Sequence, residues 1–441
     1  MNIIGIIAEY NPFHNGHLYQ IEEIRKRTNA DYIVVAMSGN FVQRGTPAIV
    51  DKYCRTRMAL SCGADLVVEL PALWSTASAE DFASAGVSLF TKMGCVTGLC
   101  FGAETANLSL LQKIASVLCE EPIAFSEELS LQLKKGQSFP SARALALLHY
   151  FSNYATSMTC TMEELQDILN APNNILAIEY LKAIKRFDSP LVPHLIQRKG
   201  AGYHDTDIEA ANASATAIRE FIQSQTPAAV TASCALNISS SSIAKKSSNI
   251  PWDKLKTSMP ANALSLLEKE NCYVTADDFS SILNYLLLLY TNTDSLANFS
   301  DCNVDIANRL SNNLPLFKSF TQFAEATKSK DVTYTRMSRI LLHILLHFTK
   351  EDYLCFRKKG YTPYIRPLGF QKKSAGILSS IKKESSIPLL SKLADASSIL
   401  DADSLELLQK DIFAANLYEQ IAAQKKMTTP RNEFSREIVI L

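Results

Sequence analysis

The sequence predicts an α/β protein in which a doubly wound parallel sheet is followed by a mainly α-helical C-terminal domain. Three observations lead to this fold class. Short β-branched runs alternate with amphipathic segments through the first two hundred residues, a stretch rich in serine, alanine and threonine follows, and the remaining pattern is mostly helical. The length of 441 residues exceeds what one ordinary hydrophobic core organises, so more than one domain is expected.

The strands expected in the first part are short runs rich in isoleucine, valine and leucine. They span residues 3–8, 32–37, 65–70, 98–101 and 191–197. Helices are expected from about residue 17, from about residue 51, and over residues 79–90 and 108–118, because apolar residues recur there at helical spacing. Strands that alternate with helices in this way predict a parallel sheet.

The composition changes after Arg219, and residues 224–249 are the best candidate for a domain boundary. We therefore divide the chain into an α/β domain (residues 1–222), a linker (residues 223–250) and a mainly helical domain (residues 251–441). The clearest helices of the last part are residues 280–290, 335–349 and 405–424, and one strand-like piece spans residues 361–370.

Charge and cysteine usage exclude several classes of protein. Lysine and arginine balance aspartate and glutamate, 44 against 44, so no overall field attracts a polyanion. The ten cysteines form no C-x-x-C pair and no zinc-type spacing with histidine, which predicts reduced thiols, no protein-held metal and a cytoplasmic location.

The N-terminus lacks a basic region before its apolar run, and no apolar stretch approaches the ~20 residues that cross a bilayer, so no membrane partner is expected.

The chemistry-bearing segment follows the first predicted strand and reads Asn-Pro-Phe-His-Asn-Gly-His, residues 11–17. It lies where a strand ends and a helix begins, and open α/β sheets bind ligands at that edge, with helix N-termini favouring anions. His14 and His17 are three residues apart, so both side chains can point at one phosphate group. Gly16 allows a phosphate to approach the backbone closely. The segment is neither a dinucleotide fingerprint nor a Walker A loop, because it has one glycine and no Gly-Lys-Ser/Thr.

These residues and several others carry a resemblance to a known family. H-x-G-H after a first strand resembles the nucleotidyltransferase superfamily, which shares its Rossmann-like (HUP-type) fold with class I aminoacyl-tRNA synthetases. Longer segments resemble the bacterial tRNA(Met) cytidine acetate ligases over essentially the whole chain. They are EYNPFHNGHLY (9–19), MSGNFVQRG (37–45), PNNIL (172–176), GAGYHD (200–205), SATAIR (214–219), YTR (334–336) and RPLGF (366–370).

The resemblance implies an ATP-dependent carbon–nitrogen ligase that forms acetyl-adenylate from acetate and ATP, releasing diphosphate. The acetyl group would then pass to N4 of the wobble cytidine of elongator tRNA(Met), leaving AMP. Its substrates would be ATP, acetate and that tRNA, with no DNA partner. Mg²⁺ is expected to arrive with ATP, because no carboxylate dyad or metal cluster is evident.

The same resemblance implies the site residues. His14 and His17 would be catalytic, supplying imidazole N–H donors that stabilise charge on the phosphates. The ATP-binding residues would be Ile7, Ala8, Glu9, Tyr10, Asn11, Pro12, Phe13, His14, Asn15, Gly16, His17, Leu18, Tyr19, Gln20, Gly102, Asn173, Asn174 and Arg198, together with Ser214 and Thr216 in a second phosphate-contacting motif. One or both of Asn173 and Asn174 would contact ATP, and either can also cap the helix that follows.

The second substrate needs cationic contacts for its backbone. Between residues 336 and 383 basic residues are interleaved with aromatic ones, and the only acids are Glu351 and Asp352. The predicted tRNA-binding residues are Arg336, Arg339, Lys372, Lys373, Lys382 and Lys383. Residues 38–50 would form either a lid or a surface for the cytidine, and residues 51–57 would otherwise form an ordinary solvated helix face.

Two other functions remain open from the sequence. A small-molecule adenylyltransferase of the pantetheine-phosphate or nicotinamide-mononucleotide type would use the same histidine chemistry, although its usual single-domain size leaves the helical half without a role. A non-catalytic RNA-binding protein with a nucleotide site is the other alternative, and the intact His14, Gly16 and His17 argue against it.

Overall fold

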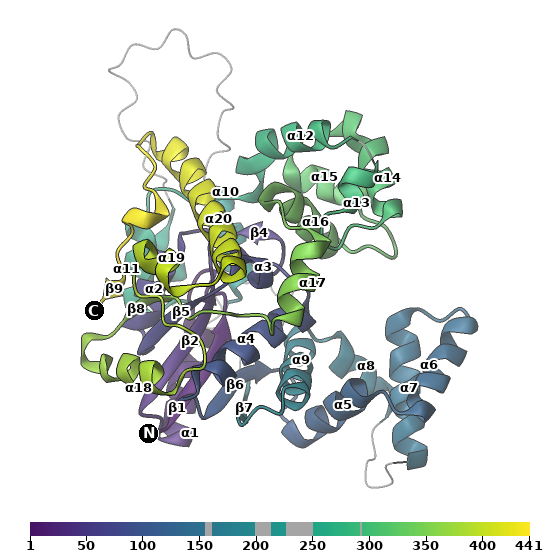
Figure 1. Cartoon of the computed structure of the whole chain (residues 1–441). Coiled ribbons are helices and arrows are strands. Elements are labelled where there is room, and N and C mark those ends of the chain that lie inside the picture. The colour runs from purple at the N-terminus through teal and green to yellow at the C-terminus, as the bar shows by residue number, and fades with distance from the viewer. Residues whose placement is uncertain (155–160, 199–212, 226–249, 292) are drawn as a thin grey trace.

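The computed structural model describes residues 1–154, 161–198, 213–225, 250–291 and 293–441 (Figure 1). A seven-stranded sheet forms its centre, in the order β7-β6-β1-β2-β5-β8-β9. Five strands run parallel, and they match the five strands predicted from the sequence: β1 (Ile3–Ala8), β2 (Tyr32–Ser38), β5 (Leu66–Leu70), β6 (Gly98–Ala103) and β7 (Val192–Gln197). The fold class predicted from the sequence is confirmed.

Two strands from the C-terminal half complete the sheet. β8 (Pro367–Phe370) pairs antiparallel with β5, and β9 (Val439–Ile440) pairs parallel with β8. The sheet is therefore mostly parallel rather than wholly so, and residues 367–370 and 439–440 extend the sheet of the N-terminal part. The domain boundaries at residues 222 and 251 stay a prediction, and residues 226–249 of the proposed linker lie outside the described residues.

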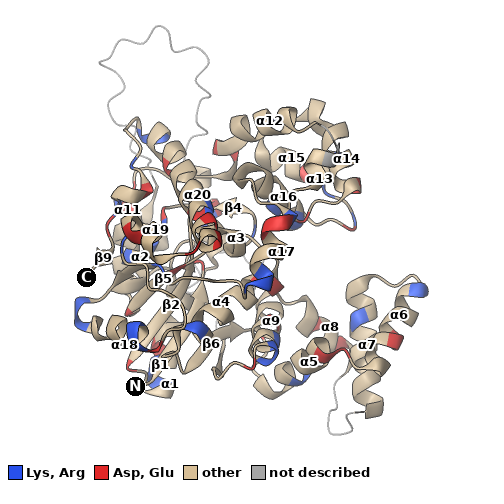
Figure 2. Ribbon diagram, viewed as in Figure 1, with Lys and Arg blue, Asp and Glu red and all other residues tan. Residues whose placement is uncertain are grey.

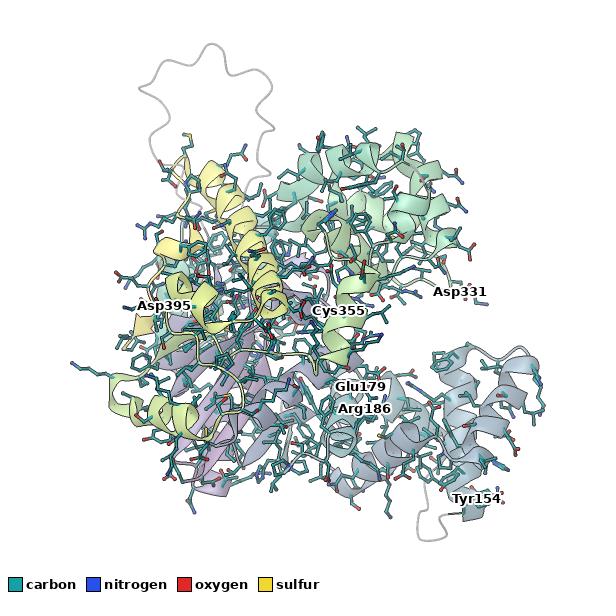
Figure 3. The ribbon with its side chains drawn as sticks, viewed as in Figure 1. Tyr154, Glu179, Arg186, Asp331, Cys355 and Asp395 are labelled. Carbon is teal, nitrogen blue, oxygen red and sulfur yellow. The ribbon has the colours of Figure 1, made fainter. Side chains whose placement is uncertain are left out.

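The central strands are apolar on both sides, as expected for parallel strands that are covered by helices. One face packs against α1 (Asn15–Thr28), α2 (Lys52–Ser61), α10 (Ala215–Gln225) and α11 (Ala261–Lys269). The other packs against α3 (Ala72–Ser75), α4 (Ala79–Met93) and α9 (Pro172–Arg186), with α16 (Tyr334–Leu346) and α20 (Ala402–Lys426) beyond them. On α9, Arg186 (labelled in Figure 3) pairs with Glu80 of α4 at 2.6 Å, so an ion pair joins these two helices at the surface.

Most of the remaining chain is helical, and its helices fall into two groups by their order in the chain. Four helices lie between β6 and α9: α5 (Leu108–Glu120), α6 (Ile123–Lys134), α7 (Phe139–Tyr154) and α8 (Met162–Asn170). Figure 1 shows that α6 and α7 project away from the sheet. The second group comprises α12 (Ser280–Leu289), α13 (Thr293–Ala297), α14 (Val304–Asn313), α15 (Phe320–Thr327), α17 (Lys350–Lys358), α18 (Gly376–Glu384) and α19 (Ala396–Ile399). No helix in the described part of the chain combines the length and apolar character needed to cross a membrane.

A buried ion-pair network attaches the C-terminal half to the sheet. Lys52 of α2 lies 2.6 Å from Glu69 of β5 and 2.7 Å from Glu433, in the 3-10 turn η6 (Glu433–Ser435). Arg366 contacts the same two carboxylates at 2.8 and 2.5 Å. Two cations and two carboxylates balance in charge, which permits their burial.

Candidate active site

The two histidines cap the helix that follows β1. His14 is the N-cap of α1, and its Nδ1 accepts a hydrogen bond from the Gly16 N–H at 3.0 Å. In return, Nδ1 of His17 accepts from the His14 N–H at 3.2 Å. A ring nitrogen that accepts from an N–H carries no proton, so each neutral imidazole holds its proton on Nε2. The cap therefore leaves both rings with an Nε2–H donor directed away from the helix backbone.

Aromatic packing fixes the orientation of these rings. The His14 and His17 ring centroids lie 3.8 Å apart with an interplanar angle of 32°, and the buried Tyr10 meets His17 edge-on at 4.8 Å. Phe13, also buried, lies 5.4 Å from His17. A Cβ added at Gly16 would stand 2.8 Å from Cε1 of His14. The His14 ring therefore leaves no room for a side chain at position 16.

Both histidines are neutral in the folded protein. Burial lowers the pKa of His14 to about 3, and Arg198 and Arg219 act in the same direction. Burial also lowers the pKa of His17 well below its usual value, with contributions from His14 and Arg198. An imidazole that is neutral and whose Nδ1 is occupied acts as a hydrogen-bond donor rather than as a cation.

The start of α10 lies beside the histidine loop. Arg219, which is partly buried, donates to the Asn11 carbonyl at 2.6 Å and to the Thr216 hydroxyl at 3.0 Å. The Ser214 hydroxyl caps α10 by accepting from the Ala217 N–H at 3.1 Å. Arg219 thus joins the start of α10 to the histidine loop, and the binding of phosphate by Ser214 and Thr216 stays a prediction.

Gly102, Asn173 and Arg198 meet at the ends of β6 and β7. Arg198 continues β7, its Nη1 lies 3.5 Å from Oδ1 of Asn173, and a Cβ at Gly102 would stand 3.3 Å from its Cγ. Because β1, β6 and β7 are neighbouring parallel strands, these residues and the histidines share one edge of the sheet. The segment at residues 200–205 lies outside the described residues.

The two asparagines have different environments, and neither caps α9. The N-cap is Ala171, and the capping interaction comes instead from Glu104, whose carboxylate accepts from the Asn174 N–H at 2.9 Å and the Asn173 side chain at 2.6 Å. Asn174 is buried and its amide holds Thr105 through two hydrogen bonds, at 3.0 and 2.9 Å. Glu104 is not among the residues predicted from the sequence, although it directly follows β6 and lies two residues after Gly102.

Several residues of the segment 7–20 shape the loop from within. The Asn11 amide oxygen accepts from the Ile49 N–H at 2.8 Å, and the Glu9 carboxylate accepts from the Gln43 N–H at 3.0 Å. The Asn15 amide donates to the Thr257 carbonyl at 2.7 Å. The other members include Ile7, which packs against the helix glycine Gly86, and Leu18, Tyr19 and Gln20, which lie along α1 near the core.

Residues 41–47 form a hairpin of β3 (Phe41–Val42) and β4 (Thr46–Pro47) at the same sheet edge. Helices from the C-terminal half hold it: the Ser338 hydroxyl donates to the Gly45 carbonyl at 2.9 Å, and the Tyr418 hydroxyl donates to the Ala48 carbonyl at 2.8 Å. The Ser75 hydroxyl holds the Phe41 carbonyl at 3.0 Å. These anchors favour a fixed surface over a lid.

The predicted tRNA-binding residues fall into two separate places. Arg336 and Arg339 lie on α16 beside the hairpin, where both contact Asp301, Arg339 through an ion pair of 3.1 Å. Lys372, Lys373, Lys382 and Lys383 follow β8 and lie at the opposite edge, because β8 ends at Phe370 opposite Leu66, the first residue of β5. Figure 2 shows basic residues in blue on and beside α18. Strands of five or six residues separate the two edges by ~20 Å. The structure therefore does not bring the four lysines to the histidines.

The chain is similar to known proteins along its whole length. The sequence matches the HIGH Nucleotidyl Transferase family over residues 1–433. A protein of Clostridium perfringens (strain SM101) named tRNA(Met) cytidine acetate ligase is 38% identical over 433 residues, which cover 97% of this chain and 98% of the relative. A protein of the same name from Acetivibrio thermocellus is 35% identical over 445 residues, with both chains fully covered. The crystal structure of Thermotoga maritima TmcAL bound with alpha-thio ATP is 30% identical, with a TM-score of 0.86 over the whole of both chains.

Proposed function

Because the chain belongs to the HIGH nucleotidyl transferase family, together with the tRNA(Met) cytidine acetate ligases, we propose that it is an ATP-dependent ligase that acetylates a cytidine of tRNA(Met). In the first step acetate attacks the α-phosphate of ATP, giving acetyl-adenylate and diphosphate. In the second step N4 of the wobble cytidine attacks the acetyl carbonyl. The C–O bond to AMP breaks, one N4 proton is released, and the products are N4-acetylcytidine and AMP.

The observation that carries this proposal is the pair of neutral histidines with occupied Nδ1 atoms. Their Nε2–H groups are fixed donors next to the start of α10 and Arg219. Negative charge moves onto the leaving diphosphate when the α-phosphate is attacked, and preorganised donors stabilise that charge without reorganisation. Adenylate formation then needs no nucleophilic side chain, because the acetate carboxylate is itself the nucleophile. Side chains that donate hydrogen bonds are sufficient.

We assign the nucleotide to the groups along the same edge. His14 and His17 bind the phosphates, the start of α10 with Ser214, Thr216 and Arg219 receives the diphosphate, and Gly102, Asn173 and Arg198 hold the nucleoside end. Asn173 is the better candidate of the two asparagines, because it is partly exposed, whereas Asn174 is buried and both ends of its amide are bound to Thr105. We assign Mg²⁺ to the ATP phosphates, since this ion commonly keeps several waters and binds through substrate phosphates. We propose that the reaction takes place in the cytoplasm, where the tRNA substrate is present.

The test uses purified protein with ATP, ¹⁴C-acetate and either elongator tRNA(Met) or a tRNA without a wobble cytidine. The expected result is label in N4-acetylcytidine at the wobble position of elongator tRNA(Met) alone, with one AMP formed for each acetyl group. Transfer of the adenylyl group of ATP to a phosphorylated small molecule, with release of diphosphate, would instead support an adenylyltransferase. Absence of any turnover while tRNA still binds would support a non-catalytic RNA-binding protein.

A further inference from the structure

Arg55, in the middle of α2, is fully buried, and its partners among the described residues are all main-chain oxygens. Its Nε donates to the Val50 carbonyl at 3.2 Å, its Nη1 to the carbonyls of Glu9 and Ser38 at 2.7 and 3.0 Å, and its Nη2 to the Gly39 carbonyl. No carboxylate of the described chain forms an ion pair with this guanidinium. Burying a cation without an anionic partner is costly, so these four contacts must offset a large desolvation penalty.

The four carbonyls belong to the two segments that form the catalytic edge. Glu9 directly follows β1 and precedes the histidine loop, whereas Ser38 and Gly39 end β2 and lead into the hairpin of residues 41–47. Val50 closes the segment that follows the hairpin. A single planar group therefore joins the start of the ATP-binding loop to both ends of the hairpin segment.

Two further contacts tie the same segments together. The Glu9 carboxylate accepts from the Gln43 N–H at 3.0 Å, and the Asn11 amide accepts from the Ile49 N–H at 2.8 Å. The hairpin turn carries Gln43, which is partly exposed and whose side-chain amide has no hydrogen-bond partner among the described residues. A carboxamide offers one acceptor and two donors, which suits the amino group and ring nitrogen of a cytosine edge.

We propose that Arg55 is a positioning residue that fixes the distance between the ATP-binding loop and the hairpin, and that the hairpin forms the side of the site that receives the cytosine. This inference rests on the proposed function. It goes beyond that function by assigning the two half-reactions to two segments: the loop forms the adenylate, and the hairpin presents the base that attacks it. Arg55 then matters most for the second step, in which both segments act at once.

Lysine at position 55 is the informative substitution. It keeps the charge, but its single ammonium nitrogen cannot span carbonyls that a guanidinium reaches with three separate nitrogens. Misplacement of a reacting group by about 1 Å costs roughly 100-fold in rate. In R55K we expect acetate-dependent exchange of diphosphate into ATP, which reports adenylate formation, to stay within about threefold of wild type, whereas acetyl transfer to tRNA in a single turnover falls roughly 100-fold.

Arg25 provides a matched control at the opposite sheet edge. It likewise donates to main-chain carbonyls, of Ala30 at 3.2 Å and Gly63 at 2.9 Å, and it also contacts Asp65. R25K removes comparable hydrogen bonds far from the loop and the hairpin. It should lower the melting temperature without changing the ratio of the two half-reactions.

A second variant moves the hairpin without touching Arg55. Gly45 has φ = 77°, and a Cβ there would collide with the backbone of Arg339. G45A should therefore reproduce the selective loss of acetyl transfer. The proposal is overturned if both half-reactions of R55K and G45A fall by the same factor, or if neither falls. If wild-type protein makes no acetyl-adenylate, the proposed function fails instead, and the two failures are distinguishable.

Discussion

At His14 and His17 the hydrogen bonds of the α1 cap select the tautomer, and this decides what the rings can do. The sequence predicts both histidines as N–H donors to a phosphate, from their spacing and their place after β1. It does not predict that each Nδ1 is used to cap the helix, because an N-cap is usually serine, threonine, aspartate or asparagine. The tautomer of each ring therefore follows from the geometry of the cap and cannot be read from the residue types alone.

Substitutions at His17 can separate capping from catalysis. The Asn side-chain oxygen lies near the position of Nδ1, whereas the Gln side-chain nitrogen lies near that of Nε2. We expect H17N to keep the melting temperature but to lower the rate of acetyl-adenylate formation by roughly 100- to 1,000-fold, because the phosphate donor is lost. H17Q should retain more activity and lose more stability. The reverse ranking in exchange assays and thermal denaturation would contradict the assignment of Nε2–H as the phosphate donor.

The lowered pKa of His14 predicts a dependence of stability on pH. The folded-state pKa is about 3 and the unfolded value is near 6.5, so the unfolded chain binds the proton more readily between these limits. The stabilising effect of a neutral His14 is complete above pH 6.5 and is lost as the pH falls toward 3. H14N, which keeps a capping oxygen, should therefore show a shallower decline of unfolding free energy between pH 6.5 and 5 in urea titrations.

The pH dependence has to be compared between wild type and H14N, because the titration of another buried group changes the stability in the opposite direction. Burial raises the pKa of Asp411 to about 7, so the folded state holds that proton more tightly and gains stability as the pH falls. The absolute slope for wild type combines both effects. Parallel slopes for wild type and H14N would show that His14 is not the titrating group.

Asn173 and Asn174 should differ in the kind of defect they cause. Asn173 is partly exposed beside Arg198, so N173A should raise the KM for ATP by roughly tenfold with little change in melting temperature. N174A leaves the Thr105 N–H without its acceptor and should destabilise the fold by about 1–3 kcal/mol while sparing the KM. ATP titration of the exchange reaction, paired with denaturation curves, measures both effects.

At the scale of elements, α2 shows where the sequence pattern misleads. Residues 51–57 resemble a solvated helix face, and that interpretation is wrong for Lys52 and Arg55, which are both fully buried. Their partners lie on β5, on η6 and at the ends of β1 and β2. Contacts between residues so distant in the chain leave no periodicity in α2 itself. The pairing of β8 and β9 with the sheet also joins residues that are distant in the chain, so the local pattern does not show it. β9 is, in addition, only two residues long, which is too short for a recognisable strand pattern.

The ion-pair network predicts that η6 stabilises the whole fold through Glu433. E433Q leaves Lys52 and Arg366 sharing the single carboxylate of Glu69, so one buried cation is uncompensated. We expect a loss of about 3–5 kcal/mol in the free energy of unfolding. D403N removes the exposed pair between Lys359 and Asp403 and should cost less than about 1 kcal/mol. Equal losses of unfolding free energy in E433Q and D403N, measured by urea denaturation, would show that the buried network does not stabilise the fold.

At the scale of the whole molecule, the two clusters of basic residues lie at opposite edges of the sheet. From the sequence they form one basic region, since residues 336–383 contain only two acids. The fold divides this region because β8 carries the chain from the carboxyl edge to the amino edge. A cytidine that reacts at the histidine edge brings the anticodon loop close to α16 and the hairpin. Arg336 and Arg339 are then the nearer cations, and the four lysines can only meet more distant parts of the tRNA.

This division predicts an order of effects on tRNA binding. R336A/R339A should weaken binding about tenfold and reduce the slope of log affinity against log salt by about one for each phosphate that is no longer bound. The quadruple alanine variant of Lys372, Lys373, Lys382 and Lys383 should weaken binding less, and both variants should form acetyl-adenylate normally. D301N removes the carboxylate that pairs with Arg339, so it should leave binding unchanged or strengthen it. Filter binding at several salt concentrations measures all three, and a larger loss in the lysine variant would place the tRNA across the amino edge instead.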